Sequence, residues 1–239
     1  ADLRILHAKG LRANEAVLTG ESLPCDKHAG AVAEDAPLGD RHGMLYSGTL
    51  VASGTATGLV VATGSATELG RISALVNNAG VVDVTARVDA MSTERLRRMF
   101  DTNVIGSIVC AREAVRRMST RHGGSGGAIV NVSSAASRLG SAHQYVDYAA
   151  AKGAIDTFTI GLAREVAAEG IRVNAVRPGL IETDIHASGG LPDRVRDLSH
   201  QVPMLRGGTA DEVAEAIVWL MSPAASYTTA TLMDVSGGS

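Results

Sequence analysis

Two residues of the segment YAAAK have the types and the spacing that acid–base chemistry needs. Tyr148 and Lys152 stand four positions apart, so on a helix both side chains project from one face. A nearby ammonium group stabilises tyrosinate and lowers the pKa of tyrosine from about 10 toward neutrality, which lets a phenol act as an acid or base. An isolated YxxxK is usually only a solvated helix face, so a catalytic reading requires further residues.

Two other side chains could complete such a site. Ser134 ends the apolar run AIVNVSS, and its hydroxyl could polarise a substrate carbonyl beside Tyr148. Asn103, in the segment DTN, could anchor a water molecule that links Lys152 to solvent. Tyr145 is not expected to be the acid–base group, because no lysine stands four positions after it. The sequence therefore predicts a proton-transfer site built from a serine, a tyrosine, a lysine and an asparagine.

The elements that must position these side chains alternate between strand and helix from residue 75 onward. Short apolar runs bounded by glycine, proline or polar residues predict four strands, SALVNN at 73–78, AIVNVSS at 128–134, IRVNAV at 171–176 and ATLMDVS at 230–236. Helical spacing of apolar residues predicts helices near 100–120, 147–168 and 210–221, the last capped by Thr209. This alternation predicts an α/β fold, with a Rossmann-like parallel sheet and flanking helices in the C-terminal two-thirds of the chain.

The first 74 residues follow a different pattern. The segment MLYSGTLVASGTATGLVVATG, at 44–64, contains two β-rich runs separated by SGTA, which predicts a hairpin. The one convincing helical window is TELGRISAL at its end. We therefore expect a β-rich, antiparallel N-terminal segment.

Composition excludes several classes of protein. The chain has 239 residues, 45% of them hydrophobic, which can support a large core, and its formal net charge of -3 gives no basic footprint for nucleic acid. No apolar run approaches the ~18 residues of a membrane span, and the N-terminus does not look like a signal peptide. Cys25 and Cys110 lie far apart, which suggests neither a disulfide framework nor a metal site. We expect a soluble, cytoplasmic protein.

Five motifs occur in one order, each on the element that its chemistry needs. They are LVNNAG, DTNVIGS, IVNVSS, YAAAK and RPGLIETD. From about residue 73 to the final DVSGG the chain resembles the short-chain dehydrogenase/reductase family. The resemblance implies an oxidoreductase that uses NAD or NADP on a small carbonyl or alcohol substrate.

The resemblance also implies individual roles. Tyr148 would donate or accept the proton, Lys152 would lower its pKa and bind the ribose, Ser134 would orient the carbonyl and Asn103 would anchor the relay. The implied cofactor-binding residues are Asn78, Ala79, Gly80, Tyr148, Lys152, Pro178, Gly179, Ile181 and Thr183.

Several residues receive weaker expectations. His143 and His186 could face a substrate pocket, although loop histidines are usually surface residues, and Ser133 should support Ser134. The loop 182–203 should cover the substrate. Six arginines should form solvated or subunit-contacting faces: Arg95, Arg97, Arg98, Arg112, Arg116 and Arg117.

The phosphate site of the family has no good match in this chain. That site needs a first strand, a turn of the form TGxxxGxG and a helix N-terminus aimed at the pyrophosphate. The nearest segment is TGSATELG at 63–70, where Glu68 brings bulk and negative charge to the middle glycine position. Leu75, in the predicted strand 73–78, follows Gly70 so closely that no second or third strand fits between these two residues. We therefore expect a reductase portion that lacks its first three strands.

Residues 1–72 resemble instead the actuator domain of P-type cation ATPases. The resemblance covers ADLRILHAKGLRANEAVLTGESLP and GDRHGMLYSGTLVASGTATGLVVATGSATELGRIS. It implies that Glu21, in TGES, corresponds to a glutamate that positions water against an aspartyl phosphate. The chain contains no DKTGT motif to supply that aspartate, so we do not expect ion pumping.

The chain therefore looks like a chimera with its junction near residues 72–75. Recombination, deliberate engineering and a wrongly joined reading of residues 1–74 would all give this pattern. Two functions follow: an NAD(P)-dependent oxidoreductase, or a catalytically inactive chimera or interaction module.

Two further expectations concern assembly. Without a first strand, SALVNN becomes a sheet edge, and we expect a β-rich segment at 44–53 or 58–63 to pack at or near it. The helices 100–120 and 147–168 resemble those of the family's subunit contact, which implies a dimer or tetramer.

Overall fold

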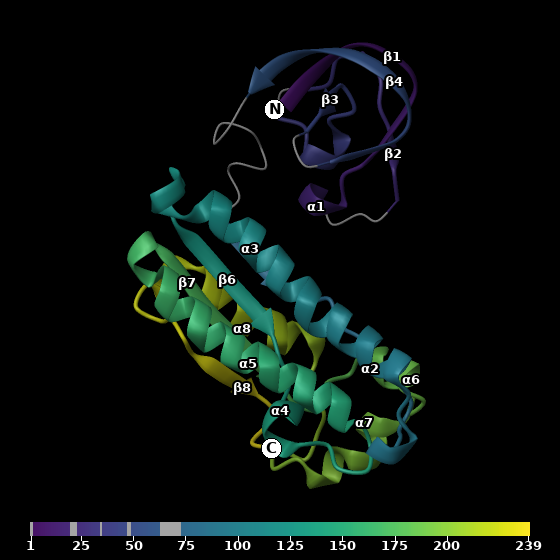
Figure 1. The fold of residues 1–239 in the computed structure, drawn as a ribbon, viewed down its shortest axis with the longest axis vertical. Helices are drawn as coiled ribbons and strands as arrows, with labels where there is room; N and C mark the ends of the chain where they lie inside the picture. Colours follow the sequence, from purple (N-terminus) through teal and green to yellow (C-terminus); the bar gives the residue numbers. More distant parts are fainter. Residues whose placement is uncertain (1, 20–22, 34, 47–48, 63–72) are drawn as a thin grey trace. The chain divides into compact units, whose positions relative to one another are not determined.

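The computed structural model describes residues 2–19, 23–33, 35–46, 49–62 and 73–239. The chain divides into two compact units, Ala1–Ile72 and Ser73–Ser239, each described by itself (Figure 1). Glu21 and the segment 63–70 lie outside the described residues, as does most of the helical window 67–75. The end of that window is strand, because β5 (Ala74–Asn77) begins there.

The first unit is an antiparallel sheet centred on one long strand. Strand β1 (Asp2–Asn14) pairs with β2 (Cys25–Asp26), β3 (Met44–Leu45) and β4 (Leu50–Ala62). A short helix, α1 (Ala16–Thr19), and a 3-10 turn, η1 (Leu38–Asp40), connect the strands. This arrangement confirms the β-rich, antiparallel expectation.

The hairpin expected within residues 44–64 is wrong. Strand β4 runs straight through SGTA and pairs with β1 along its length, with register shifts near Lys9 and Arg12. Gly54 has a φ of +82°, and a Cβ there would collide with the backbone of Gly10. Glycine in this left-handed conformation lets the strand bulge and continue where the sequence suggested a turn.

A buried ion pair lies inside the first unit. The Lys27 ammonium is 2.7 Å from Glu15 Oε1, and both side chains are almost fully buried. The same ammonium lies 5.8 Å from the ring centroid of Tyr46, which is also buried.

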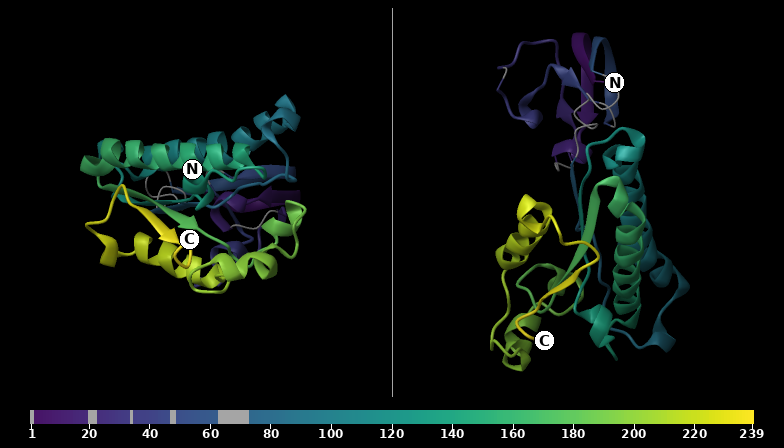
Figure 2. Two further views of the ribbon diagram at one scale, coloured as in Figure 1. Left: turned by 90° about the horizontal axis from the view of Figure 1, so that it is seen from below. Right: turned by 90° about the vertical axis from the view of Figure 1, so that its left-hand side faces the viewer.

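The second unit contains a parallel sheet in the order β5-β6-β7-β8. Its strands are β5 (Ala74–Asn77), β6 (Gly127–Val132), β7 (Ile171–Pro178) and β8 (Leu232–Val235). All four predicted strands are confirmed. Helices α3 (Ser107–Met118) and α5 (Val146–Val166) cover one face and α8 (Ala210–Met221) covers the other (Figure 2).

The helix expected over 100–120 is three elements. Helix α2 (Thr93–Phe100) begins after Ser92, whose side chain accepts a hydrogen bond from the Arg95 amide. A π-helical segment, η5 (Asp101–Gly106), then joins it to α3. The helix near 147–168 is α5 followed by the 3-10 turn η7 (Ala167–Glu169).

The predicted cap of the last helix is confirmed. Thr209 and Glu212 form a reciprocal capping box at the start of α8. Other short elements of this unit are η4 (Val88–Ala90), η6 (Thr120–His122), α4 (Ala136–Leu139), α6 (Ile185–Ser188), α7 (Arg194–Leu198), η8 (Ser199–Gln201) and η9 (Pro223–Ala225).

A buried chain of polar side chains crosses the core beneath the site. Asn77 donates to Asn131 Oδ1 at 2.8 Å, and Asn131 donates to Thr159 Oγ1 at 2.9 Å. Thr159 in turn donates to the carbonyl of Ile155 at 2.8 Å. Because buried polar groups need partners, these bonds fix the register between β5, β6 and α5.

Strand β5 is the end strand of the parallel sheet. Strands β3 and β4 both have β1 as their hydrogen-bonding partner. The expectation that the segment 44–53 or 58–63 packs at or near β5 stays a prediction.

Across the described ranges, no helix is long and apolar enough to cross a membrane.

Candidate active site

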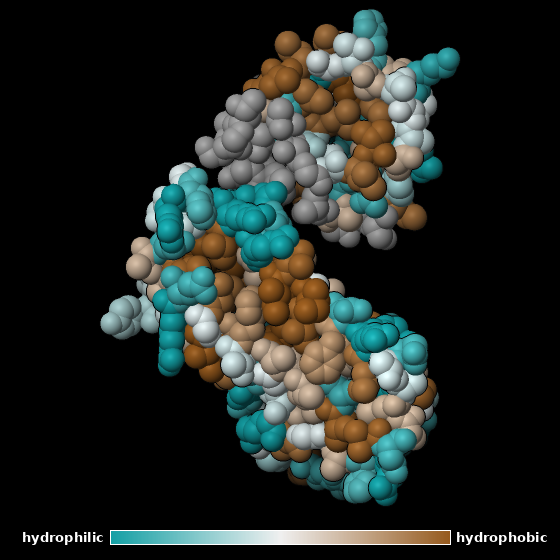
Figure 3. Space-filling model, in the orientation of Figure 1, coloured by the Kyte–Doolittle hydropathy of each residue, from teal (hydrophilic) through white to brown (hydrophobic). Residues whose placement is uncertain are grey.

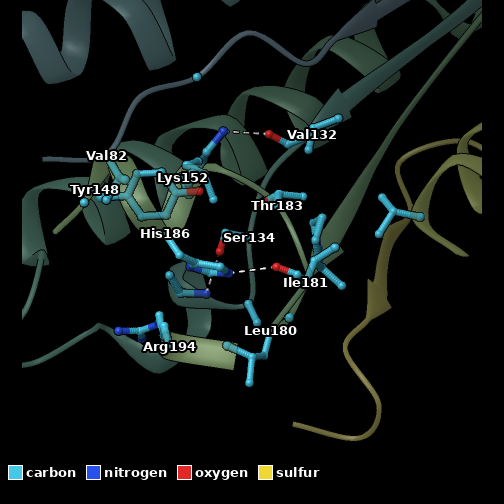
Figure 4. A pocket seen from close by; sticks show the side chains of 18 of the residues that line it. Val82, Val132, Ser134, Tyr148, Lys152, Leu180, Ile181, Thr183, His186 and Arg194 are labelled. Atoms are coloured by element: carbon cyan, nitrogen blue, oxygen red, sulfur yellow. Dashed lines mark hydrogen bonds between the residues drawn. The ribbon is translucent and has the colours of Figure 1, made fainter. Parts of the chain in front are cut away.

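The carboxyl ends of the parallel strands open onto a cleft of about 1030 Å³ (Figure 4). The loops after β5, β6 and β7 line it, together with one face of α5 and the segment from α6 to η8. Parallel strands bring their carboxyl ends to one edge of the sheet, so residues distant in sequence meet there. Nine of the predicted catalytic and cofactor-binding residues line this cleft: Asn78, Gly80, Ser134, Tyr148, Lys152, Pro178, Gly179, Ile181 and Thr183.

Tyr148 and Lys152 lie on the same face of α5, as their spacing predicted. The Lys152 ammonium is 5.6 Å from the centroid of the Tyr148 ring, and it donates to the carbonyl of Val132 at 2.8 Å. Ser133 Oγ donates to the carbonyl of Lys152 at 3.1 Å. The end of β6 therefore binds this turn of α5 at two points, the ammonium and the backbone carbonyl of Lys152. Ser133 thus tethers α5, and its expected support of Ser134 stays a prediction.

The pKa of Tyr148 differs from the expectation. Burial raises the pKa of this phenol, its hydrogen bond with Ser134 lowers it, and the neighbouring Tyr145 raises it, with a net rise. Burial also lowers the pKa of Lys152 to about 8, against an opposing effect of Asp156. The expected lowering of the tyrosine pKa is wrong for this structure, because tyrosinate loses hydration and the ammonium bonds a backbone carbonyl instead. A neutral Tyr148 is suited to donating a proton.

Ser134 lies at the end of β6 beside the tyrosine. Its Oγ accepts a hydrogen bond from the Ala136 amide at 3.1 Å, and it also bonds the Tyr148 side chain. The serine and tyrosine hydroxyls can therefore both reach one oxygen atom in the cleft.

Asn103 is fully buried and does not line the cleft. Its side-chain amide makes two bonds with the backbone of Val81, each 2.9 Å long. A Cβ added to Gly80 would lie 2.9 Å from Asn103 Oδ1 and 3.4 Å from Lys152 Nζ. Asn103 thus pins the chain after β5 against the lysine, at a position that only glycine fits. Its role in a proton relay stays a prediction.

The remaining predicted cofactor residues divide into those that line the cleft and one, Ala79, that does not. Gly179 lies against the backbone of Ser236, where a Cβ would come within 2.7 Å of the Ser236 Cα, so the end of β7 requires a glycine. Pro178, Ile181 and Thr183 also line the cleft. Ala79 is exposed and is not among the lining residues.

Of the two histidines, His186 faces the cleft and His143 is exposed outside its lining. His186 Nε2 bonds the carbonyl of Ile181 at 2.8 Å, which assigns the proton to Nε2 in the neutral ring. Burial lowers the pKa of His186, so the ring is neutral at pH 7.

Arg95 is not on a solvated face. It is buried, and its guanidinium bonds both oxygens of Asp147, at 2.7 and 3.3 Å, and the carbonyl of Val84 at 2.6 Å. Asp147 also accepts from the Tyr148 amide at 2.9 Å. The arginine therefore locks the start of α5, where the tyrosine stands. The signal was its i, i+4 spacing from Met99, which shares the buried side of α2.

Arg194 is the other functional candidate that sequence reasoning missed. It lines the cleft, and its guanidinium carbon lies 5.3 Å from the centroid of the Tyr145 ring. No motif marks it in the sequence, because α7 reaches the cleft only in the folded chain.

Comparisons with known proteins agree with this geometry. Residues 53–239 match the family model described as enoyl-(acyl carrier protein) reductase. The chain belongs to the short-chain dehydrogenase/reductase family. An uncharacterized oxidoreductase of Escherichia coli (strain K12), YgfF, is 60% identical over 167 residues, which cover 70% of this chain and 68% of that protein.

Other relatives of this short-chain dehydrogenase/reductase are more distant. The 3-oxoacyl-[acyl-carrier-protein] reductase FabG of Vibrio harveyi is 37% identical over 72% of this chain and 68% of its own length. A solved structure of ElxO with NADP bound superposes with a TM-score of 0.63 at 32% identity, over 71% of this chain and 67% of that one. The chain spans about two thirds of the length of these three proteins.

A second family model matches the other end of the chain. Residues 1–77 match the P-type ATPase actuator domain, so the two matches overlap at residues 53–77.

Proposed function

We propose that this protein reduces a carbonyl group, or oxidises the corresponding alcohol, with NAD or NADP. The observation that carries the proposal is the meeting of Ser134, Tyr148 and Lys152 in one cleft at the carboxyl edge of the sheet. The oxidoreductases among its relatives, and the NADP-bound ElxO, support it.

The residues present fit the nicotinamide half of such a cofactor. The cleft of about 1030 Å³ has room for a flat ring and a ribose, and Gly80 and Gly179 line it where the backbone packs closely on Asn103 and Ser236. Asn78, Lys152, Pro178, Ile181 and Thr183 would hold that half. When bound, the nicotinamide supplies or accepts the hydride. The nearest match to the family's pyrophosphate turn, 63–70, lies outside the described residues.

The chain's own residues supply the proton chemistry. Ser134 would donate a hydrogen bond to the carbonyl oxygen and hold it within reach of the Tyr148 hydroxyl. Tyr148, kept neutral by burial, would give its proton to that oxygen as negative charge develops there. Lys152 would then help to return a proton to the phenol, through a water anchored by Asn103.

A titration of NADH and NADPH, followed by fluorescence and calorimetry, tests the cofactor step. Micromolar binding of either one supports the oxidoreductase. Substitution Tyr148→Phe should lower turnover by roughly 10²-fold or more with unchanged melting temperature, because it removes the one proton donor and little volume. Full activity of this variant would exclude the assigned role.

A second candidate function is a catalytically inactive chimera or interaction module. The match of residues 1–77 to an actuator domain favours it, because that match stands where relatives carry their nucleotide-binding strands. The division of the chain after Ile72 supports a junction near residues 72–75. Millimolar or undetectable affinity for both nucleotides would support this candidate instead.

We also propose that the protein is a dimer or tetramer through its α3 and α5 faces. Apolar side chains gather along these helices in Figure 3. Val109 of α3 is exposed, as are Phe100 and Ile105 in the segments that lead into α3. Light scattering after size-exclusion chromatography tests this, and a monomer at all concentrations would contradict it.

A further inference from the structure

Arg194, the first residue of α7, lines the cleft and has no carboxylate partner in the described part of the chain. Its Nη1 atom is buried, and none of the residues that the structure describes accepts a hydrogen bond from it. The adjacent carboxylate, Asp193, pairs with Arg196 at 2.9 Å. A buried guanidinium nitrogen without an acceptor is costly, and the side chain lines the cleft, where an anion from outside the chain can approach the rest of the guanidinium.

The position of Arg194 connects it with the acid–base tyrosine. Its guanidinium packs on the ring of Tyr145, and that ring meets the ring of Tyr148 edge-on, with centroids 6.4 Å apart. In the view of Figure 4, Arg194 lies at the end of the cleft away from Lys152, with His186 drawn between them. A ligand that lies along Tyr145 could therefore touch Tyr148 at one end and Arg194 at the other.

The other charged groups of the cleft leave Arg194 as the anion site. The Lys152 ammonium already donates to the Val132 carbonyl, and His186 is neutral because burial lowers its pKa. Asp184 is exposed at the rim and would repel an anion there. Apolar side chains make up much of the wall between the two ends, including Val82, Leu180, Ile185 and Leu198.

We propose that the substrate is a carbonyl compound with a carboxylate at its far end, and that Arg194 binds this carboxylate. A guanidinium presents paired N–H donors that match the two oxygens of a carboxylate, and the water-poor site strengthens the pair. The apolar wall would hold the carbon skeleton while Ser134 and Tyr148 hold the carbonyl. This inference rests on the proposed reductase function.

The test compares para-acetylbenzoate with its methyl ester, which differ in charge and share the ketone. Calorimetry should show that the full-length protein binds the acid about tenfold or more tightly than the ester. Arg194→Gln should remove this preference, and Arg194→Lys should keep part of it. The control is Arg121→Gln, an exposed arginine outside the lining of the cleft, which should keep the full preference.

Two results would overturn the proposal. One is equal affinity of the wild-type protein for acid and ester. The other is an equal loss of both ligands in Arg194→Gln, which would mean that Arg194 only holds α7 against Tyr145. Turnover of the ester, followed by oxidation of NADPH, is measured separately. Arginine-dependent binding of the acid without turnover of either ligand would contradict the reductase function and leave the anion site standing.

Discussion

Burial sets the protonation of the two groups at the centre of the site. The raised pKa keeps Tyr148 protonated, whereas Lys152, whose pKa is about 8, loses its proton more readily than an exposed lysine. The site as it stands is therefore arranged for proton donation to a carbonyl. Reversal toward alcohol oxidation needs additional positive charge near the phenol.

Lys152 should make stability depend on pH in the alkaline range. Its pKa falls from 10.5 to about 8 on folding, so between these values the folded protein binds fewer protons than the unfolded chain. Stability therefore rises with pH across this window, and the cost of the buried charge is greatest below it. The free energy of unfolding of Lys152→Met should exceed that of the wild type at pH 7.5. This difference should shrink by roughly 2–3 kcal/mol from pH 7.5 to 10.5.

Urea unfolding at both pH values measures this difference. Lys9→Met, which changes an exposed lysine, should show no such change between the two pH values. An advantage of Lys152→Met that stays constant with pH would contradict the lowered pKa.

Gly80 should not tolerate a side chain. In Gly80→Ala the new methyl group would press on Asn103 Oδ1 and approach Lys152 Nζ, so the chain after β5 would shift out of place. We expect turnover and nucleotide affinity to fall by about tenfold or more, since small displacements of a site cost rate steeply. The control is Gly153→Ala, where the methyl group meets nothing within 4 Å. Alanine in mid-helix should stabilise α5 by about 0.5–1 kcal/mol.

At the scale of elements, the site depends on how α5 is anchored. Ser133 holds the carbonyl of Lys152 at the end of β6, and Arg95 holds Asp147 at the first turn of the helix. These two contacts fix the height and rotation of the helix against the sheet. The buried Asn77, Asn131 and Thr159 chain then fixes its register.

Removal of one member of the Arg95–Asp147 pair should destabilise the second unit strongly. Arg95→Met or Asp147→Ala leaves a buried charge without its partner, which costs about 3–5 kcal/mol. Chemical denaturation should show this loss, and the double variant should lose less than the sum of the two single variants. Arg97→Ala, on the exposed side of the same helix, should change stability by less than about 0.5 kcal/mol. Comparable effects of Arg95 and Arg97 would rule out the anchoring role.

At the scale of the whole molecule, the chain joins two units with separate cores. The first contains the buried Lys27–Glu15 pair, and the second contains the cleft. Each unit is compact by itself, so each should respond to its own substitutions.

Glu15→Ala should therefore lower one thermal transition and leave the other in place. The substitution leaves the buried Lys27 ammonium without its carboxylate partner, which should lower the free energy of unfolding of the first unit by about 3–5 kcal/mol. Differential scanning calorimetry should resolve two transitions in the wild type and shift only one in the variant. Nucleotide binding should be unchanged below the shifted transition. A single transition that moves as a whole would show that the units unfold together.

Local sequence was enough to identify the four parallel strands, the cap at Thr209 and the Tyr148–Lys152 pair. Apolar strand runs, capping residues and i, i+4 spacing are properties of short segments, so they can be recognised without knowledge of the tertiary structure. The position of Ser134 at the end of a predicted strand was also visible in the sequence, and the family's motifs added the loop residues of the cleft.

Tertiary structure decided the rest. It joined the two runs of β4 into one bulged strand, because Gly54 could lie against Gly10 on a neighbouring strand. It buried Arg95 against Asp147 and brought Arg194 to Tyr145, pairs that are far apart along the chain. It also raised the pKa of Tyr148, because burial depends on all the residues that pack around a group. The i, i+4 spacing in the sequence identified only one of these residues, Lys152.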